Sequence, residues 1–413
     1  MTKKVRTGRR KIINKKSGLH ERFIIIAALA SAAVVFFFLL LIKWNGNVLH
    51  VAYYRLPPPV TDSLTKQIRK GYAGKTRFTV LAPGTVLSRR KARRYDLLFT
   101  WNGAEADILA EKAAVIPAQL YAQIPSSERK LGSINGTNRM LPLLYDHYEL
   151  SFLRRTIQKT GNVPETWDSF THYLTNTAAD VQVPLFTAGA DNRTLLAFVG
   201  ALAESLTGPE GYARLAALLQ NAPSLDAVVN KPFGRTGSAE TPVSIRYILD
   251  LIVSWQNAGL THKTWFNGSE ADVASFMKDS ITAAVFMPLS EHRTLPLSTL
   301  HQYESSHFPA DTAVSKHALI APAVMLIAYG KNPRFSDTVR FLISVPAQET
   351  LSTDTRLAPA SSQAEAYDRQ ADDVRYWAAS YAGGPVPDLA NAAFTSSRKA
   401  DKIAGEIRNY LGK

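Results

Sequence analysis

The chain has 413 residues, with 48 Lys and Arg against 34 Asp and Glu, and 46% of its residues are hydrophobic. This length and apolar content are sufficient for two or three domains with sizeable cores. Because the chain contains no cysteine, disulfide frameworks, thiol nucleophiles, iron–sulfur clusters, cysteine zinc sites and a lipid-modified cysteine are all excluded.

The net charge of +14 is concentrated at the N-terminus rather than spread over a folded surface. Residues 1–22 carry nine Lys and Arg and one Glu, whereas the 370 residues after Lys43 hold 38 basic and 33 acidic side chains. This distribution indicates a basic arm at 1–22 and argues against a nucleic-acid-binding face, so no nucleic acid partner is expected.

An apolar run follows the basic arm. The residues from Phe23 to Ile42 include no charged side chain. As a helix the run would be about 30 Å long, which matches the hydrocarbon core of a bilayer. Lys43 and Trp44 are typical of the membrane interface. The segment 23–43 therefore predicts a single-pass signal anchor in the inner membrane, with the N-terminus in the cytoplasm and the bulk of the chain outside.

A cleaved signal peptide is the alternative for this run. Its apolar region is usually about 7–15 residues long and ends at an Ala-x-Ala-like site. Here Ala28-Leu29-Ala30 lies early in the run, and 36–42 contains no small residue. These features favour an uncleaved anchor.

Alternating strands and helices are predicted next. Residues 48–56 alternate and are rich in strand-forming types, and the prolines at 57–59 end the strand. The segments that follow are a short helix from Thr61 or Asp62 to Lys70, a strand at 76–82, a basic stretch at 88–94 and a strand at 95–101. This spacing favours an α/β layout with a largely parallel sheet.

Mostly helices are predicted for the rest of the chain. Thr166 is a suitable N-cap for a helix start, and Asp168 complements the positive helix end. Apolar periodicity indicates helices over 194–206, 212–219, 243–258, 269–278, 333–344 and 400–411, and strands over 281–287 and 318–327.

Four segments resemble motifs of a known family. They are Leu-Pro-Leu-Leu-Tyr-Asp at 141–146, Val-Pro-Glu-Thr-Trp-Asp-Ser-Phe at 163–170, the helix-to-strand segment at 276–286, and the run 331–344 with Leu-Ala-Pro-Ala at 357–360. In this order they are similar to the extracellular solute-binding proteins of sugar-type ABC importers, the maltose-binding-protein class. The likeness covers about 48–413.

The resemblance implies a two-lobed periplasmic-binding-protein-like fold of type II, with crossover strands between the lobes and a solute in the cleft. The expected lobe boundaries are 48–144 plus 281–330 for lobe 1, and 145–280 plus 331–413 for lobe 2.

The chain departs from the family pattern in its first lobe. Where the family has a long helix and a Gly-rich stretch between the second and third strands, this chain has only 83–95, much of it basic. The return motif has Asp279-Ser280 in place of Gly-Lys and Val285 in place of Met. Lobe 1 is therefore expected to be trimmed on the side that shapes the cleft.

Candidate ligand-binding residues follow from the chemistry of sugar recognition. Aromatic faces cover sugar rings, polar side chains bind the hydroxyls, and ligands of open α/β sheets lie beyond the carboxyl ends of the strands. The first, third and return strands, the lobe crossing of the family layout and a turn-rich segment then give the candidates Tyr54, Trp101, Asn102, Tyr145, Asp146, Trp265 and Met287.

Core packing is the competing interpretation for each of these residues. Trp101 is the strongest candidate, since a Trp before the Gly103 turn at a strand end has little reason to serve core packing. The basic stretch at 88–94 has three interpretations: contact with anionic lipid head groups, binding of an acidic ligand or partner, or a solvated loop.

Enzyme signatures are absent from the sequence. It contains no His-Glu-x-x-His, no phosphate-binding Gly-x-x-x-x-Gly-Lys-Ser/Thr and no Gly-x-Ser-x-Gly motif. A membrane-tethered glycosidase would need two facing carboxylates, and no such pair stands out. We therefore expect a protein without catalytic residues, metal or cofactor.

The leading interpretation is a bacterial, membrane-anchored solute-binding protein. By resemblance, its two lobes would close over a sugar-like solute and the closed form would dock on an ABC permease. The alternative is a degenerate binding fold that serves as a structural or regulatory module of the cell envelope, with its cleft filled by side chains.

Overall fold

The computed structural model describes Ser31 and residues 48–413, except 83, 237–239 and 331–334. Leu49–Lys413 form one compact unit. The predicted basic arm and the anchor residues Phe23, Ile42, Lys43 and Trp44 lie outside the described residues. Within the described part of the chain, no helix is both long enough and apolar enough to cross a bilayer.

A six-stranded sheet is the centre of lobe 1, in the order β15-β6-β14-β3-β1-β2. β1 and β3 run parallel, with Val51 opposite Leu97 and Tyr53 opposite Phe99, and β14 is antiparallel to both β3 and β6. The predicted α/β layout is therefore confirmed, but the expected largely parallel sheet is not, because β14–β3, β14–β6 and β15–β6 all pair antiparallel. The spacing of strands and helices along the chain covers only β1 to β3, and the antiparallel partners return from distant parts of the sequence. The strands are β1 (Val48–Tyr53), β2 (Lys75–Val80), β3 (Leu97–Trp101), β6 (Met140–Tyr145), β14 (Ala323–Ala328) and β15 (Ala358–Pro359), with a small hairpin of β4 (Ser133–Ile134) and β5 (Thr137–Asn138) beside them.

Helices cover both faces of this sheet. The first of them begins at Pro58 rather than at the predicted Thr61 or Asp62, because proline lacks only an N–H group that the first helical turn leaves unpaired in any case. Among the described residues, the connection from β2 to β3 contains only the single helical turn α3. The helices are α2 (Pro58–Gly71), α3 (Arg89–Ala92), α4 (Ala104–Ala110), η1 (Ala118–Tyr121), α5 (Ser126–Arg129), η2 (Lys130–Gly132), α13 (Phe335–Leu342), α14 (Val345–Thr355) and α15 (Arg369–Ser380).

Lobe 2 is built on a four-stranded sheet in the order β12-β7-β11-β8. β11 is parallel to β8, with Ala284 opposite Leu185, and antiparallel to β7, with Phe286 opposite Leu150. The strands are β7 (Tyr148–Leu153), β8 (Val183–Thr187), β11 (Thr282–Pro288) and β12 (Tyr303–Ser306), accompanied by β9 (Gly234–Arg235) and β10 (Pro242–Val243).

The longest helix of lobe 2, α8, is broken in its middle. Gly208 has a φ of 68°, which an L side chain rarely adopts, and Pro209 follows it. The predicted helices over 194–206 and 212–219 are the two halves of this helix. The helices of lobe 2 are α6 (Arg154–Thr160), α7 (Trp167–Thr177), α8 (Asn192–Asn221), α9 (Ile245–Asn257), η3 (Trp265–Asn267), α10 (Glu270–Lys278), α11 (Leu289–His292), α12 (Leu297–Leu300), α16 (Leu389–Ala393) and α17 (Ser397–Leu411).

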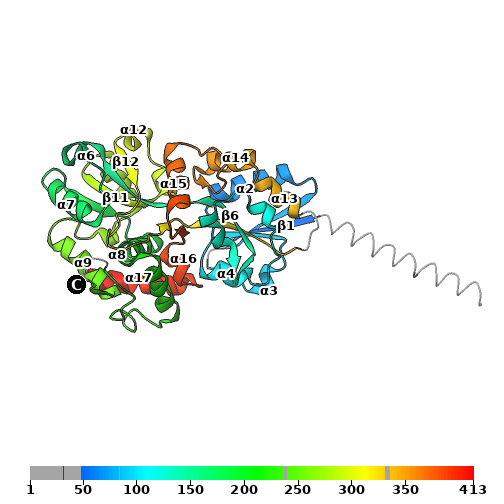
Figure 1. The fold of residues 1–413 in the computed structure, drawn as a ribbon, viewed down its shortest axis with the longest axis horizontal. Coiled ribbons are helices and arrows are strands. Elements are labelled where there is room, and N and C mark those ends of the chain that lie inside the picture. The colour runs from blue at the N-terminus through cyan, green and yellow to red at the C-terminus, as the bar shows by residue number, and fades with distance from the viewer. Residues whose placement is uncertain (1–30, 32–47, 83, 237–239, 331–334) are drawn as a thin grey trace, which may run out of the picture. The chain divides into compact units, whose positions relative to one another are not determined.

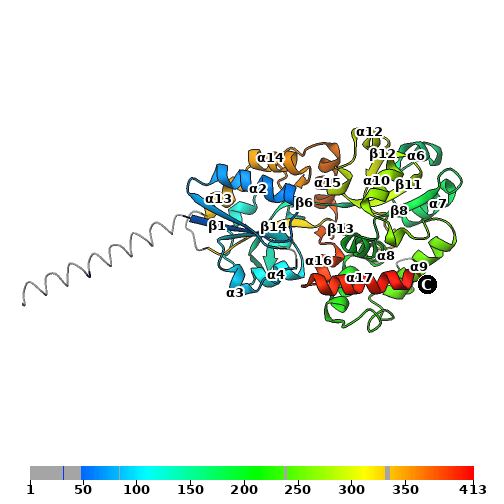
Figure 2. The same cartoon turned by 180° about the vertical axis from the view of Figure 1, so that it is seen from behind.

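The chain passes between the lobes three times within the described part of 49–413. The first crossing joins β6 directly to β7, as predicted. The second and third crossings contain β13 (Leu319–Ile320) and β16 (Pro385–Val386), which pair in parallel. Both cartoon views show α15 and α16 between the elements of the two lobes (Figures 1 and 2).

The predicted lobe boundaries are wrong for β11 and β12 and for the segment from α13 to α15, whereas β14 lies in lobe 1 and α16 and α17 lie in lobe 2 as predicted. β11 and β12 pair with β7 in the second sheet instead of joining lobe 1. The segment from α13 to α15 packs in lobe 1 instead of lobe 2, with β15 paired to β6. All residues of β11 are buried, and a fully buried strand has no alternation that could assign it to one sheet rather than another.

Each lobe has its own hydrophobic core. The core of lobe 1 centres on β3, β6 and β14, and that of lobe 2 on β7, β11 and the first half of α8. All residues of both cores lie between Leu49 and Leu411, so a fragment spanning 49–413 retains every buried contact described here. Such a fragment is expected to fold independently.

A core deletion in the central strand of lobe 1 is expected to be costly. Leu326 is fully buried in β14, opposite Phe99 on one side and Leu141 on the other. Leu326→Ala should lower the free energy of unfolding of the 49–413 fragment by about 2–5 kcal/mol, because it leaves a cavity in a two-sided core. Val80→Ala, at a position 66% exposed, should change it by no more than about 0.5 kcal/mol. Urea unfolding measures both, and equal small effects would contradict the prediction.

Candidate ligand-binding site

A cavity of about 350 Å³, here called the interlobe cavity, lies where the carboxyl ends of β1, β3 and β8 approach α16 and the start of α17. Lobe 1 contributes Arg55 and Trp101, and lobe 2 contributes 190–193. Ligands of open α/β sheets bind beyond the carboxyl ends of the strands, so this cavity is the candidate site. Its other lining residues are Leu196, Ala390, Asn391, Phe394, Ser396, Ser397, Ala400 and Asp401.

The lobe 1 wall of the interlobe cavity is held by a short polar chain. Trp101 donates from its indole Nε1 to the carbonyl oxygen of Arg55 at 3.0 Å. The Arg55 guanidinium pairs with Glu105 at 2.9 Å, and the Tyr54 hydroxyl donates to the other Glu105 oxygen at 2.7 Å. Burial raises the pKa of Glu105. Arg55 thus reaches the cavity with its charge partly compensated.

The lobe 2 wall is the N-terminus of α8. Asp191 caps this helix by accepting from the Thr194 backbone N–H at 2.7 Å. The Asn192 amide donates to Asp401 at 2.6 Å and accepts from Arg408 at 2.6 Å. These bonds fix one amide and two carboxylates beside the cavity.

Arg193 joins the lobes at the edge of the interlobe cavity. Its guanidinium lies over the Trp101 ring, 4.6 Å from the centroid, and pairs with the fully buried Asp388 at 2.9 Å. Burial alone would lower the pKa of Arg193, but the charges of Asp388 and Asp146 raise it, so the side chain remains a cation. Asp388 also caps α16 by accepting from the Asn391 N–H at 3.0 Å.

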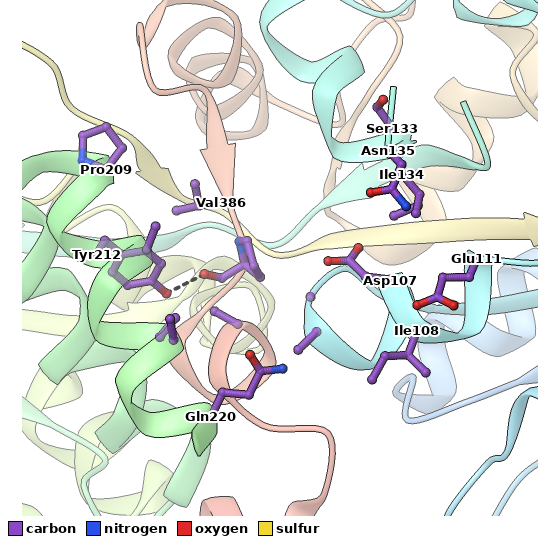
Figure 3. A pocket seen from close by; sticks show the side chains of 17 residues that line it. Asp107, Ile108, Glu111, Ser133, Ile134, Asn135, Pro209, Tyr212, Gln220 and Val386 are labelled. Atoms are coloured by element: carbon purple, nitrogen blue, oxygen red, sulfur yellow. Dashed lines mark hydrogen bonds between the residues drawn. The ribbon is translucent and has the colours of Figure 1, made fainter. Parts of the chain in front are cut away.

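A second cavity of about 620 Å³ lies on the other side of α16 (Figure 3). Asp107 and Glu111 of α4 face Tyr212 and Gln220 of α8 across it. The helix α16 contributes to the walls of both cavities, with Asn391 in the smaller one and Ala392 in the larger one.

The turn between β3 and α4 touches α16 directly. Gly103 has a φ of 131°, and a Cβ atom there would lie 2.3 Å from the carbonyl oxygen of Asn391. Only glycine permits so close an approach of the two backbones. As a result, α16 packs directly on the turn at the end of β3.

Further bonds tie α15 of lobe 1 to lobe 2. The Gln370 amide donates to Glu149 at 2.7 Å and to Ser305 at 2.6 Å, and Glu149 also pairs with His292. Although burial alone would raise the pKa of Glu149, His292 and the hydrogen bonds lower it to about 2. Arg293 forms a two-pronged ion pair with Asp368 at the start of α15. The lobes are therefore joined by charged and polar contacts.

The sequence candidates fall into two groups. Trp101 lines the interlobe cavity, and Tyr54 supports its wall. Asn102 is bonded in both directions to the backbone of Ala323, and within the described residues its amide nitrogen has no partner. Asp146 accepts from the Ser290 N–H at 2.9 Å and from its hydroxyl at 2.8 Å. These four candidates lie at or beside the site.

The other three candidates lie in the cores rather than in the cleft. Tyr145 is fully buried and donates from its hydroxyl to Glu128. Trp265 packs edge-on against Phe198 at 5.3 Å between ring centroids. Met287 is buried in β11. All residues of β6 and β11 are buried, so their sequences carry no alternation that separates a cleft-facing side chain from a core side chain.

The sequence did not indicate Arg193 or Asp388 as site residues, and it did not indicate the residues of α16 and α17 that line the interlobe cavity. Asp191 before a predicted helix is a recognisable N-cap signal, and it places Asn192 and Arg193 in the first helical turn. The role of Asp388 depends on the third crossing, which the predicted lobe boundaries had misplaced.

The described residues contain no group of three or more His, Cys, Asp or Glu side chains that could hold a metal ion. Arg55, Asp191, Asn192, Arg193 and Asp401 of the interlobe cavity instead form hydrogen bonds or ion pairs with neighbouring groups. They can recognise a polar solute through exposed amides, carboxylates and a guanidinium group.

Sequence comparisons find no similar protein: no family model matches the chain, and a search of the curated proteins gives no match. Structural comparison does find similar folds. The bacterial solute receptor AcbH, described as exclusively preferring β-D-galactopyranose, is 11% identical with a TM-score of 0.69, over 88% of this chain and 97% of its own.

Two further structures give the same result. The putative binding protein MsmE of Bacillus subtilis, in an open conformation, is 14% identical with a TM-score of 0.64 over 88% of this chain and 95% of its own. A probable secreted solute-binding lipoprotein of Streptomyces coelicolor is 13% identical with a TM-score of 0.59 over 89% of this chain and 98% of its own. The predicted resemblance is confirmed at the level of the fold.

The ion pair between Arg193 and Asp388 is expected to stabilise the unit. Arg193→Ala should lower the free energy of unfolding by at least about 2 kcal/mol, since it leaves the buried Asp388 carboxylate unpaired. The double variant Arg193→Ala with Asp388→Asn should recover part of this loss, because the amide needs no counter-charge.

Arg154→Ala, which removes the exposed pair with Glu304 at 3.0 Å, is the control and should cost less than about 1 kcal/mol. Urea unfolding of the 49–413 fragment and its variants measures all of these values. If Arg193→Ala is no costlier than Arg154→Ala, the ion pair is not a stabilising contact.

The buried Glu128 beneath Tyr145 predicts a pH dependence of stability. Burial raises its pKa from 4.5 to about 8, so the folded protein holds this proton more tightly than the unfolded chain. Its contribution is fully present below about pH 4.5 and is lost as the pH rises through 8. Glu128→Gln should therefore flatten the decline of the melting temperature between these limits.

The exposed Glu210→Gln serves as the matched control and should retain the wild-type slope. Melting curves at intervals across this pH range measure the difference. An identical slope in Glu128→Gln and wild type would show that folding does not raise the pKa of Glu128.

Proposed function

We propose that the chain is a bacterial extracytoplasmic solute-binding protein, held in the inner membrane by 23–43, that delivers a sugar-like solute to an ABC permease. The observation that carries this proposal is the interlobe cavity, which lies at the carboxyl ends of β1, β3 and β8 between two α/β lobes. The fold shared with sugar-binding solute receptors supports it.

The interlobe cavity suits a small hydroxyl-rich solute. Its volume of about 350 Å³ falls within the usual range of roughly 300–1,000 Å³ for small-molecule sites. Trp101 and Phe394 line it with aromatic side chains, while Asn192 and Asp401 supply hydrogen-bonding groups. Arg55 adds a cation at the same wall.

The proposed mechanism is a change of lobe separation without covalent chemistry. The three crossings act as hinges, and solute shifts the population between open and closed forms. Opening separates the Arg193 guanidinium from the Trp101 ring, since these two groups belong to different lobes. The exposed Trp101 surface then becomes available to a solute, and the closed form presents both lobes to the permease.

A second function is favoured by one observation. In this structure the Arg193 guanidinium already covers the Trp101 ring, and α16 packs on the Gly103 turn. These contacts occupy the space of a solute with groups of the chain itself. The second candidate is therefore a structural or regulatory module of the cell envelope that binds no transported solute.

A solute panel tests the proposed function. We expect one or more sugars or polyols to raise the melting temperature of the 49–413 fragment, because a ligand at 100 times its Kd adds about 2.7 kcal/mol. The shift should be lost in Trp101→Ala and largely retained in Trp101→Phe, which preserves an aromatic face.

Trp265→Phe, in the core of lobe 2, is the control for tryptophan replacement and should respond to solute like wild type. Amino acids and inorganic anions extend the panel beyond carbohydrates. A panel that is flat for wild type and also for Arg193→Ala, in which the Trp101 face is uncovered, would favour the second function.

A further inference from the structure

One stretch of lobe 1 carries a large excess of positive charge. Residues 63–104 contain ten Lys and Arg but a single acidic residue, Asp96. Asp96 is 5% exposed and accepts from the His50 backbone N–H at 2.8 Å. The stretch therefore presents cations to solvent without any exposed carboxylate of its own.

These cations gather at one edge of the lobe 1 sheet. β1 and β3 are parallel, and β2 ends beside the end of β1, because Leu81 donates to the carbonyl of Tyr53 at 3.0 Å. The beginnings of the three strands therefore share one edge. α2 ends at this edge and α3 leads into β3 there, as both views of the fold show (Figures 1 and 2).

We define the basic pole as the exposed cations at or next to this edge that are not engaged elsewhere. Arg89 is left out because it pairs with Glu111 at 2.7 Å, Lys66 because it pairs with Asp354, and Lys75 because it also has an interaction partner. In the part of the chain that the structure describes, none of the members forms an ion pair with a carboxylate. The basic pole consists of Arg69, Lys70, Arg77, Arg90, Lys91, Arg93 and Arg94.

The start of the folded unit lies at the same edge. Asp96 donates from its backbone N–H to the carbonyl of His50 at 2.8 Å, so Arg93 and Arg94 come just before a residue bonded to the beginning of β1. Only residues 44–48 separate Lys43 from Leu49. Even fully extended, this length of chain spans at most about 20 Å.

We propose that the basic pole binds the anionic head groups of the bilayer in which the chain is anchored. The proposal rests on the proposed anchor for its tether, and on the described surface for its charge. A short tether keeps the pole close to the lipid surface, where attraction to anionic lipids acts over about one Debye length, roughly 8 Å. An acidic protein partner would not need the charges to gather beside the tether.

Vesicle binding by the 49–413 fragment tests this proposal without the anchor. The fragment should sediment with vesicles of phosphatidylcholine and phosphatidylglycerol, but not with vesicles of phosphatidylcholine alone, and high salt should release it. The triple variant Arg90→Gln, Arg93→Gln and Arg94→Gln should bind about a hundredfold more weakly, at about fivefold per charge.

The matched control removes the same charge from lobe 2. The control is a triple variant at three exposed positions of that lobe: Lys231→Gln, Lys263→Gln and Lys278→Gln. It should leave vesicle binding within about twofold of wild type. Circular dichroism spectra of both triple variants serve as the check that they are folded.

Three outcomes would overturn the proposal. They are no binding to anionic vesicles, equal weakening by the two triple variants, and capture of an acidic protein through the pole with unchanged vesicle binding in the Arg90, Arg93 and Arg94 variant. Since no solute enters the assay, a flat solute panel leaves this test unaffected. The two proposals can therefore fail separately.

Discussion

Parallel pairing of β1 with β3, and of β8 with β11, is the constraint on which the other features depend. Parallel strands begin at one edge of a sheet and end at the other. In lobe 1 the ends bring Arg55 and Trp101 together, and the beginnings bring the basic pole beside the start of the folded unit. One topological choice therefore gives the lobe two chemically distinct edges, one facing the partner lobe and the other carrying uncompensated cations.

The sequence could predict those parts of the fold that carry a local signal, such as a turn residue or an apolar periodicity. Trp101 before a Gly turn was recognisable because a strand end and a turn residue are local signals. The sequence predicts a strand at 281–287 and, by resemblance, a lobe crossing at 141–146. It marks no cleft face in β6 or β11, because every residue in these strands is buried and neither shows a periodicity. Tyr145 and Met287 were misplaced for this reason, and β11 was assigned to the wrong lobe.

Arg193 and Asp388, which the sequence did not indicate as site residues, escaped prediction for a different reason. Arg193 and Asp388 are 195 residues apart in sequence, and neither belongs to a motif with a fixed spacing. Their pairing exists only because the third crossing returns the chain to the N-terminus of α8. Local signals do predict the N-cap at Asp191, so the position of Arg193 was within reach, but its partner was not.

The contacts between α15 and lobe 2 have a consequence for how tightly any solute would be held. Arg293 with Asp368, and Gln370 with Glu149, stabilise the joined lobes without lining the interlobe cavity. When only the separated form admits a solute, the observed affinity is the intrinsic affinity reduced by the fraction of molecules in that form. Binding strength is then adjustable from residues that never touch the solute, and the recognition surface can stay unchanged while affinity varies.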